Sequence, residues 1–568
     1  MLLLKKYWPY IILAIIVGIG GFLRFWDLSS VPPSIYPDEA KNANDAITTF
    51  TQNNWRIFYP ENNGREGMYI WLIALAFKTF GISVFSFKIV SAIIGTLTII
   101  ATYFITKEIF LFSTRPNGAA VQARFSVFAR ETAGLLAAGF LATSFWHLNF
   151  SRIGFRAISV PLFLSVGLYF TLRALRRSNW LDAVIAGLIW GAGYYTYISF
   201  RFSFLIPAFI LGALIIAYII ENKPRLSWRW LENAHRAVWP LIIVAATAAA
   251  SLIPLLLYFA SHPQDFVSRA TGISVFDEPS PIAAFLKSLG VHLLALFSNG
   301  DANWRHNFPG EAQLFWPVAF LFVAGIIYSL WVMYEGIKYR NWNMTAAHAT
   351  LFAWFFALIL PAALTVEGIP HALRAIGLMP VVFIFAAFGF LLFVKLVFPH
   401  RHERSDFWPF GVGTALILIF LLASSQFSHY FNDWGNRQEV AGAFTTPLAQ
   451  IGYYFNAVEK IEPDTQKFLI VNEGGVEVSY PREVLPENNE NGTLPMSAQT
   501  TLFIQQIKHI SVQNTTYITP NDLPVFVGSA ATFVPLRADN EIKNRLRFLY
   551  PQGMENYIAD IWVYEIGL

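Results

Sequence analysis

The sequence predicts an α-helical membrane protein that carries a small α/β domain at its C-terminal end. Of its 568 residues, 55% are hydrophobic and only 13% are charged, whereas soluble domains carry about 25% charged residues. Eleven apolar runs are long enough to cross a bilayer, which requires about 20 residues per helix. The net charge is +11 over residues 1–427 and −7 over residues 428–568. A domain boundary is therefore expected after the last apolar run.

Each apolar run is predicted to form a transmembrane helix. The first run follows Lys5 and Lys6 and has no small-residue cleavage site after it, so we expect an uncleaved anchor. The chain contains no cysteine, which excludes disulfides, thiolate metal sites and cysteine nucleophiles. The eleven windows lie at 7–25, 89–106, 132–151, 157–173, 180–199, 202–220, 237–260, 313–334, 346–366, 375–394 and 407–427.

The stretch 68–81 is apolar but short, and it contains Lys78. Lysine and arginine collect in cytoplasmic loops, and a cytoplasmic N-terminus with eleven spans satisfies this rule. A twelfth crossing at 68–81 would put the basic cluster at 107–130 outside. We therefore expect 68–81 to be a juxtamembrane helix in a plasma-membrane protein. In this topology the cytoplasmic basic clusters lie at 107–130, 173–177, 223–236, 338–340 and 395–404.

The predicted topology places most of the unexplained charged residues on the outer face. The interiors of the spans hold almost no ionisable residue, which argues against an ion-coupled transporter. We divide the chain into a transmembrane domain, 1–427, and an extracytoplasmic α/β domain, 428–568. In the second domain we expect helices at 448–460 and 499–509, and strands at 467–471, 524–527 and 561–566.

The first outer loop contains the sequence I-Y-P-D-E-A-K at 35–41. Its adjacent carboxylates, Asp38 and Glu39, lie where water, a lipid headgroup and a polar substrate can meet. Sugar transfer from a lipid phosphate requires a carboxylate that takes the proton from the acceptor hydroxyl. Asp38 is the candidate base, Glu39 is its catalytic neighbour, and Tyr36 is a candidate substrate contact. The alternative is an acidic pair that only opposes a helix dipole.

A departing phosphate also requires cationic groups around it. Arg152 and Arg156 occupy a short outer turn against the positive-inside bias, which makes them candidate ligands of a donor phosphate. Binding of ordinary lipid headgroups is the alternative. Arg374 lies in another outer cluster, and Arg65 precedes the juxtamembrane helix. We include both among the phosphate ligands and Glu66 among the substrate contacts, with a helix-start charge pair as the alternative for Arg65 and Glu66.

Two histidines lie in outer loops, His306 in D-A-N-W-R-H-N-F-P-G-E and His371 in E-G-I-P-H-A-L-R-A-I-G. They are candidate substrate contacts, and a divalent metal is a possible cofactor that they would ligate. Hydrogen-bonded loop histidines are the alternative. The sequence contains no Gly-rich nucleotide loop, so we expect neither a nucleotide donor nor a nucleic-acid partner.

Together these motifs resemble the GT-C superfamily of membrane glycosyltransferases. The resemblance is greatest to glycosyltransferase family 39, the branch of protein O-mannosyltransferases and lipid A aminoarabinose transferases. The family's acidic motif maps onto Asp38. Around Arg65 the sequence N-G-R-E-G-M-Y lacks the prolines found in the aminoarabinose branch. The resemblance covers most of 1–427 and rests on P-D-E-A at 37–40, the run 69–112, the S-R turn at 151–152, N-F-P-G at 307–310 and H-A-L-R-A-I-G-L-M-P at 371–380.

The resemblance implies an inverting glycosyltransferase of the outer membrane face. Its donor would be a polyprenyl- or dolichyl-phosphate sugar, with mannose or a related sugar, and its acceptor a hydroxyl on a protein, lipid or glycan. Two other classes stay open. A flippase or transporter of the lipid-linked sugar would line a path through the bilayer with polar residues, which the spans lack. A non-catalytic membrane scaffold would leave the outer arginines unexplained.

Overall fold

The chain divides into two compact units in the computed structural model. Unit 1 comprises Met1–Trp26 and Ser91–Trp434, and unit 2 comprises Asp27–Val90 and Gly435–Leu568. The first outer loop therefore belongs to the same unit as the C-terminal region. The structure describes residues 2–113, 120–222, 228–267, 272–397, 408–479, 492–508, 515–525, 527–528 and 530–567.

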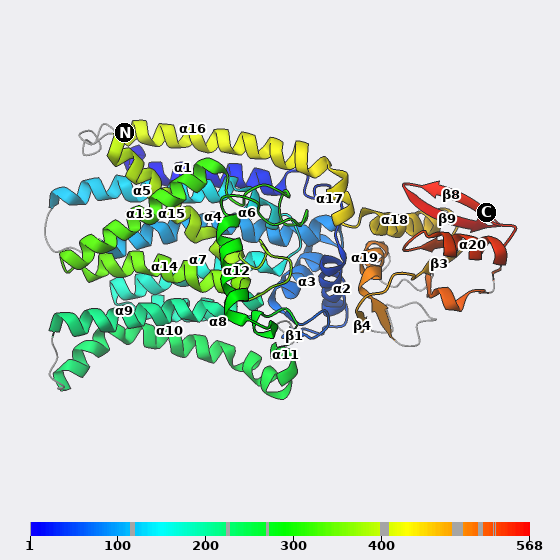
Figure 1. Ribbon diagram of the computed structural model, residues 1–568, viewed down its shortest axis with the longest axis horizontal. Coiled ribbons are helices and arrows are strands. Elements are labelled where there is room, and N and C mark those ends of the chain that lie inside the picture. Colours follow the sequence, from blue (N-terminus) through cyan, green and yellow to red (C-terminus); the bar gives the residue numbers. More distant parts are fainter. Residues whose placement is uncertain are drawn as a thin grey trace. The chain divides into compact units, whose positions relative to one another are not determined.

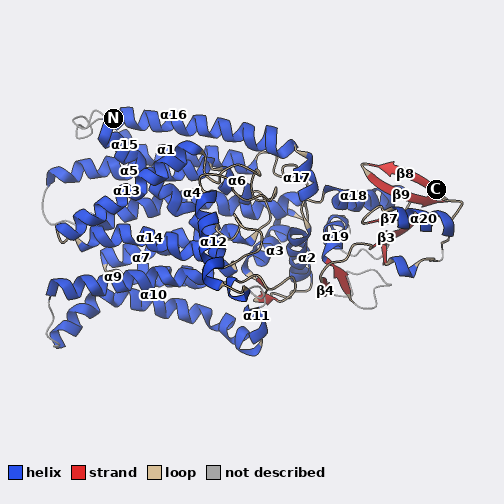
Figure 2. Ribbon diagram, viewed as in Figure 1, coloured by secondary structure: helices blue, strands red, loops and turns tan. Residues whose placement is uncertain are grey.

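Unit 1 is a bundle whose long helices lie side by side, joined by loops and short helices (Figures 1 and 2). One of the long helices, α4 (Val84–Ser113), begins in unit 2 and continues into unit 1. The others are α1 (Leu2–Phe25), α5 (Ala120–Thr143), α7 (Ser159–Arg177), α8 (Trp180–Gly193), α9 (Leu205–Asn222), α10 (Trp228–Ser261), α13 (Trp316–Lys338), α14 (Trp342–Ala363), α15 (Met379–Val397) and α16 (Trp408–Phe427). The short helices include α6 (Phe145–Phe150), α11 (Pro263–Val267) and α12 (Pro281–Ala295).

Every predicted window falls on one of these helices, and the predicted fold class is confirmed. In the described part of the chain, eight helices are long and apolar enough to cross a membrane, so the protein is an integral membrane protein. The windows on α5, α8 and α9 are not among those eight. Helix α3 (Met68–Phe80) is a shorter apolar helix, at the position predicted for a juxtamembrane helix. Several residues of the predicted cytoplasmic clusters lie outside the described residues, namely Arg115, Lys223, Arg225, Arg401 and Arg404.

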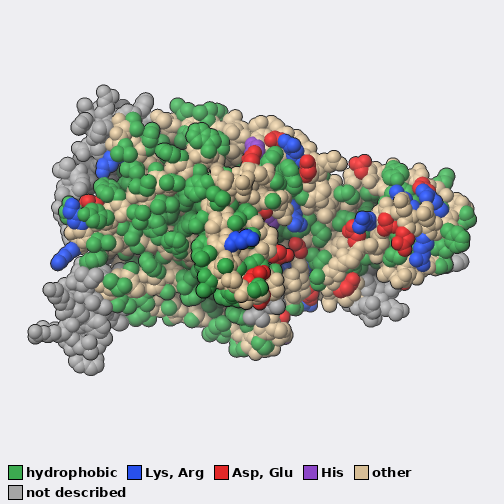
Figure 3. Space-filling model, in the orientation of Figure 1, with side chains coloured by type: hydrophobic (Ala, Val, Ile, Leu, Met, Phe, Trp, Pro, Cys, Tyr) green, Lys and Arg blue, Asp and Glu red, His purple; other side chains and the backbone are tan. Residues whose placement is uncertain are grey.

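Helix α15 lies at the centre of unit 1. Its apolar window is 83% buried, against 17% for α10. Two glycines let α13 approach α15 closely, as small residues do in membrane bundles. A Cβ atom at Gly325 would lie 1.7 Å from the carbonyl oxygen of Phe385, and one at Gly389 would lie 1.9 Å from that of Leu321. Hydrophobic side chains cover the visible outer face of the bundle (Figure 3), as a surface against lipid requires.

Unit 2 contains a five-stranded mixed sheet with the order β6-β3-β7-β9-β8. Strand β3 pairs in parallel with β6 and with the central strand β7, while β9 is antiparallel to both β7 and β8. The bounds are β3 (Gln466–Ile470), β6 (Thr515–Ile518), β7 (Ala531–Pro535), β8 (Met554–Ile558) and β9 (Ile561–Ile566). A separate hairpin pairs β4 (Glu477–Ser479) with β5 (Thr493–Pro495).

Helices cover both faces of this sheet because successive side chains of a strand point to opposite faces. Leu469 packs into the cluster that includes residues of α18 (Thr446–Ile461) and α19 (Gln499–Gln506). Its neighbour Phe468 packs into the cluster that includes residues of α20 (Asn540–Leu549). The structure thus contains four of the predicted elements, with ends that differ from the predicted ends by no more than a few residues: the helices at 448–460 and 499–509 and the strands at 467–471 and 561–566.

The strand predicted at 524–527 is wrong in its described residues. The hydroxyl of Tyr550 binds both the N–H and the carbonyl oxygen of Val525, at 2.8 Å each. A side chain therefore satisfies the backbone groups that a neighbouring strand would otherwise pair. The strand of this region is β7, which begins at Ala531.

The first outer loop is folded against the C-terminal part of unit 2. It forms α2 (Pro37–Thr51), the short strands β1 (Phe58–Tyr59) and β2 (Arg65–Glu66), and α3. The ring of Phe77 on α3 stacks on Phe503 of α19 with centroids 6.1 Å apart. The amide of Asn44 on α2 donates to the side chain of Gln499 at 3.0 Å. Segments that are distant in sequence therefore share one core.

Candidate functional site

Asp38 and Glu39 both lie in the first turn of α2, but their surroundings differ. Glu39 is fully buried, and its carboxylate accepts the backbone N–H of Tyr36 at 3.1 Å. This bond is one half of a capping box, which satisfies the free donors of a helix start. Asp38 is half-buried, and its Oδ1 accepts the side-chain amide of Asn62 at 2.6 Å. Glu39 therefore stabilises the helix, and Asp38 keeps access to solvent.

A buried charge cluster lies one turn further along α2. Asp45 accepts from the Lys41 ammonium and from the Arg65 guanidinium, each at 2.5 Å. Arg65 also donates to the Asn42 side chain at 3.0 Å and to the carbonyl oxygen of Glu61 at 3.2 Å. Burial alone would raise the pKa of Asp45, but the two cations outweigh it and lower that pKa. The same burial lowers the pKa of Lys41.

This cluster explains why Arg65 is buried. A carboxylate with two cations carries a net positive charge inside the unit, and removing one member would leave an unpaired buried charge. Arg65 lies on β2, which is the second strand of the β1–β2 hairpin. This hairpin brings the Arg65 side chain to α2. Glu66, next to it, is also buried. Of the five predicted site residues in unit 2, Arg65 and Glu39 thus have clear structural bonds, and Tyr36 is the N-cap residue of α2.

In unit 1, Arg152 is fully buried in the predicted outer turn. Its guanidinium donates to the carbonyl oxygens of Leu23 at 2.8 Å and Arg24 at 2.9 Å. These carbonyls belong to the last turn of α1, where helices leave carbonyl groups without partners. The guanidinium also lies over the ring of Phe431, 4.7 Å from its centre. Arg156, in the same turn, lies 5.3 Å from the centre of the Tyr197 ring.

His306 and His371, predicted from separate loops, are brought together in unit 1. Their ring centres are 4.9 Å apart. Asp301 lies between their loops: its Oδ2 is 2.9 Å from Nδ1 of His306 and accepts the backbone N–H of Ala372 at 2.8 Å. Its Oδ1 accepts the backbone N–H of Asn303 at 2.8 Å. Asp301 therefore ties the loop after α12 to the loop before α15 and orients His306.

A third histidine supports this arrangement. His292 on α12 accepts the backbone N–H of His371 at its Nε2, at 3.0 Å, and its Nδ1 lies 2.7 Å from the carbonyl oxygen of Ser288. Both bonds can form only when Nδ1 carries the proton and the ring is neutral. His292 is thus a structural partner of the His371 loop.

The cluster of Asp301, His306 and His371 can be tested as a metal site. In the described residues these three offer one ligand atom each, all within 4.8 Å of one another. One carboxylate and two imidazoles are ligands that Zn²⁺ accepts. However, Asp301 already receives three hydrogen bonds from the loops that it joins. Among the three, Asp301 is hydrogen-bonded to His306, whereas Nδ1 of His371 lies 3.9 Å from Asp301 Oδ2; a metal bound to all three would have to replace the Asp301–His306 bond.

Arg374 is the predicted phosphate ligand whose ion-pair partner is exposed. Its guanidinium donates to Thr365 Oγ1 and to the carbonyl oxygen of Glu367, at 2.8 Å each, and lies 3.3 Å from the Glu367 carboxylate. The Glu367 side chain is 68% exposed, against 15% for Arg374. An exposed ion pair of this kind contributes little stability, so an incoming anion can replace Glu367.

The sequence did not point to Lys41, Asp45, Asn62, Asp301 or His292 as partners of these residues. The spacing of Lys41 and Asp45, one helical turn apart, was the only local signal for any of them. Asn62, Asp301 and His292 reach their partners across 24, 5 and 79 residues of sequence. Such contacts depend on the fold of the loops, which periodicity does not reveal.

No family model matches this chain, and no curated protein sequence does. Among solved structures, the apo form of the Archaeoglobus fulgidus oligosaccharyltransferase aligns over 91% of this chain, with a TM-score of 0.50 and 15% identity. The chain has the GT-C fold. It spans 65% of the length of that oligosaccharyltransferase. The aminoarabinose transferase ArnT of Cupriavidus metallidurans, solved with undecaprenyl phosphate, aligns over 97% of each chain with a TM-score of 0.49 and 12% identity.

Proposed function

We propose that this GT-C protein is an inverting glycosyltransferase. It transfers mannose or a related sugar from a polyprenyl- or dolichyl-phosphate donor to a hydroxyl of a protein, lipid or glycan. The proposal includes the family 39 assignment, a plasma-membrane location, a cytoplasmic N-terminus and catalysis on the outer face. It also keeps the division into a membrane domain, 1–427, and an extracytoplasmic domain, 428–568.

The observation that carries the proposal is the environment of Asp38. The Asn62 amide holds one carboxylate oxygen at 2.6 Å, and the other has no protein partner in the described part of the chain. The carboxylate is therefore oriented, yet it has an oxygen available for the acceptor hydroxyl. In the reaction, Asp38 takes the hydroxyl proton as that oxygen attacks the anomeric carbon, and the lipid phosphate leaves with the electron pair of the broken bond.

The phosphate requires a cation that is not already committed to the fold. Arg374 suits this role because Glu367, its partner in the ion pair, is 68% exposed. His371, three residues before it, and His306 are close enough to each other to contact one polar group. Arg65 and Arg152 are buried and would act as positioning residues. Arg65 would hold α2 in place, and Arg152 would hold the end of α1. Arg156 stays a candidate ligand of the donor phosphate, and Glu66 and Tyr36 stay candidate substrate contacts.

The test compares wild type with Asp38→Asn, both purified in nanodiscs. Each is given radiolabelled polyprenyl-phosphate mannose and a host membrane extract as the source of acceptors. Asparagine has the shape of aspartate but does not take a proton, so we expect transfer to fall about 10²- to 10⁴-fold. Asp464→Asn, at an exposed loop position of unit 2, is the matched control and should transfer normally.

Two results would count against the proposal. Full transfer by Asp38→Asn would remove Asp38 as the base. Movement of labelled donor between leaflets without transfer to any acceptor would favour a flippase. If neither transfer nor movement occurs with donors of several sugars, the remaining class is a membrane scaffold.

A further inference from the structure

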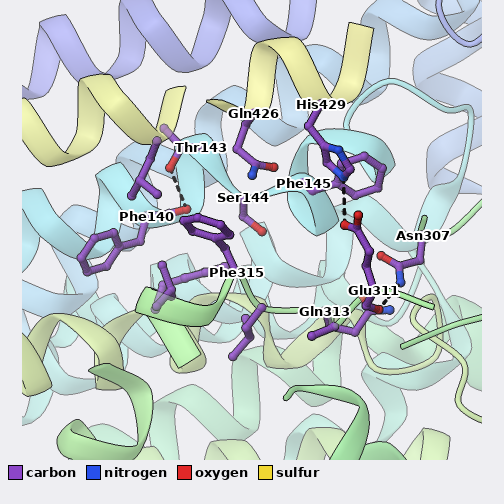
Figure 4. A pocket seen from close by; sticks show the side chains of 15 residues that line it. Phe140, Thr143, Ser144, Phe145, Asn307, Glu311, Gln313, Phe315, Gln426 and His429 are labelled. Atoms are coloured by element: carbon purple, nitrogen blue, oxygen red, sulfur yellow. Dashed lines mark hydrogen bonds and ion pairs between the residues drawn. The ribbon is translucent and has the colours of Figure 1, made fainter. Parts of the chain in front are cut away.

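A pocket that is lined by neither His306 nor His371 lies in unit 1. The ends of α5, α13 and α16 and the loop before α13 enclose it, with a volume of about 60 Å³ (Figure 4). The loop that carries Asp301 and His306 continues through Asn307, Glu311 and Gln313, all of which line the pocket. Several ordered water molecules, or one polar group of a ligand, fit in such a volume.

Two buried glutamines face this pocket. Gln313 is 7% exposed and Gln426 is 6% exposed. Both polar atoms of the Gln313 amide, and the Oε1 of Gln426, have no hydrogen-bond partner among the described residues. In Figure 4 the side-chain amide of Gln426 points toward Ser144. Because burying an unpaired amide is costly, these atoms must be satisfied from within the pocket.

The charged residues in the lining indicate which charge a ligand of this pocket would carry. It contains neither lysine nor arginine, and its carboxylate, Glu311, is paired with His429 at 3.0 Å. A phosphate would therefore meet no cation other than a histidine that is already paired. Each amide offers both donors and an acceptor, which matches the hydroxyl groups of a neutral polyol. Phe145 and Phe315 add flat apolar surfaces beside these polar groups.

One part of the pocket's lining comes from a segment with an unusual backbone. His429 lies in a π-helical segment, Ser428–Asp433, that follows α16. Such segments occur frequently at functional sites. The His429 ring stacks on Phe308, with centroids 5.3 Å apart, and lies 5.2 Å from the ring of Phe145. These contacts fix the imidazole at the edge of the pocket, next to Glu311.

We propose that this pocket binds one hydroxylated edge of a neutral ligand, a monosaccharide unit, through the amides of Gln313 and Gln426. The inference deepens the proposed function, because a glycan is one of the acceptor classes given there. The pocket would take a hydroxyl-bearing group from one sugar of such an acceptor while another sugar reacts. Binding at the pocket requires no transfer, so the two proposals can fail separately.

The experiment measures binding by saturation-transfer difference NMR on the full chain in nanodiscs. The probes are methyl α-mannoside, methyl β-glucoside and, as the charged comparison, methyl phosphate. The variant is Gln313→Met with Gln426→Met, in which both side chains keep their approximate length but lose their polar atoms. Gln438→Met, at an exposed position, is the matched control.

We expect a glycoside signal with wild type and with Gln438→Met, and affinity at least about tenfold weaker in the double variant. The double variant should melt no lower than wild type, because it removes unpaired buried groups. A glycoside that binds both forms equally, a pocket that takes up only water and no glycoside, or displacement of the glycoside by methyl phosphate would each overturn the proposal. Asp38→Asn should bind the glycoside normally, so loss of transfer with intact binding would count against the base alone.

Discussion

The buried charge cluster of unit 2 makes the sharpest prediction about folding. Asp45→Asn keeps the shape of the side chain but leaves Lys41 and Arg65 without their shared anion. The side chains of both cations are only 1% exposed, and that of Asp45 is 10% exposed. Removing one partner from a buried ion pair costs about 3–5 kcal/mol. We expect a loss of this size, since little water reaches the two cations.

Hydrogen exchange of peptides from α2, read by mass spectrometry, measures the effect where it occurs. A loss of about 3–5 kcal/mol corresponds to opening of the helix about 10²- to 10⁴-fold more often, because each 1.4 kcal/mol is a factor of ten. The matched control is Arg56→Gln, which breaks the pair of Arg56 with Glu61 at 3.5 Å. The Arg56 side chain is 42% exposed, so its loss should cost less than about 1 kcal/mol.

A second variant separates charge from packing. Lys41→Met, Asp45→Leu and Arg65→Met together replace the cluster by apolar side chains of similar size, and such replacements are often neutral or stabilising. This triple variant should exchange more slowly than Asp45→Asn. If Asp45→Asn exchanges like wild type, or if Arg56→Gln is equally damaging, the cluster is not what stabilises α2.

Three further predictions concern the pH dependence of the charge cluster, the histidine pair and the contact between α13 and α15. Because the pKa of Asp45 is lowered below its ordinary 3.8, its contribution is complete above that pH and is lost as the pH falls through the folded-state pKa. Once exchange is corrected for the intrinsic pH dependence of amide exchange, opening of α2 should therefore increase only below about pH 4, and an increase in opening near neutral pH would contradict this assignment. Chelation with EDTA should leave transfer unchanged because hydrogen bonds already hold His306 and His371 in place, whereas loss of transfer restored by Zn²⁺ would make them ligands. Gly325→Ala should lower the melting temperature because its Cβ would meet the backbone of α15, and we expect the free energy of unfolding to fall by about 1–3 kcal/mol or more. The control is Gly18→Ala, where a Cβ meets nothing within 4 Å.

The membrane spans could be predicted from local sequence, whereas many contacts of the site residues could not. The eleven windows fall on helices because an apolar run of this length has a lower free energy in lipid than in water, whatever its neighbours are. The capping role of Glu39 was also within reach of the sequence, since a glutamate three residues after the cap is typical of a capping box. The strand at 524–527 was wrong because a distant hydroxyl, that of Tyr550, binds the backbone of Val525.

The sequence by itself determined the membrane class, the positions of the spans and the presence of Asp38 in the first loop, since local composition decides each of these. Only the tertiary structure decided that Arg65 and Arg152 are buried in bonds to the protein, while Arg374 keeps an exposed partner. It also decided that two glutamines, Gln313 and Gln426, face one pocket. The physical reason is that a polar side chain is defined by what surrounds it, and its surroundings come from segments far away in the chain.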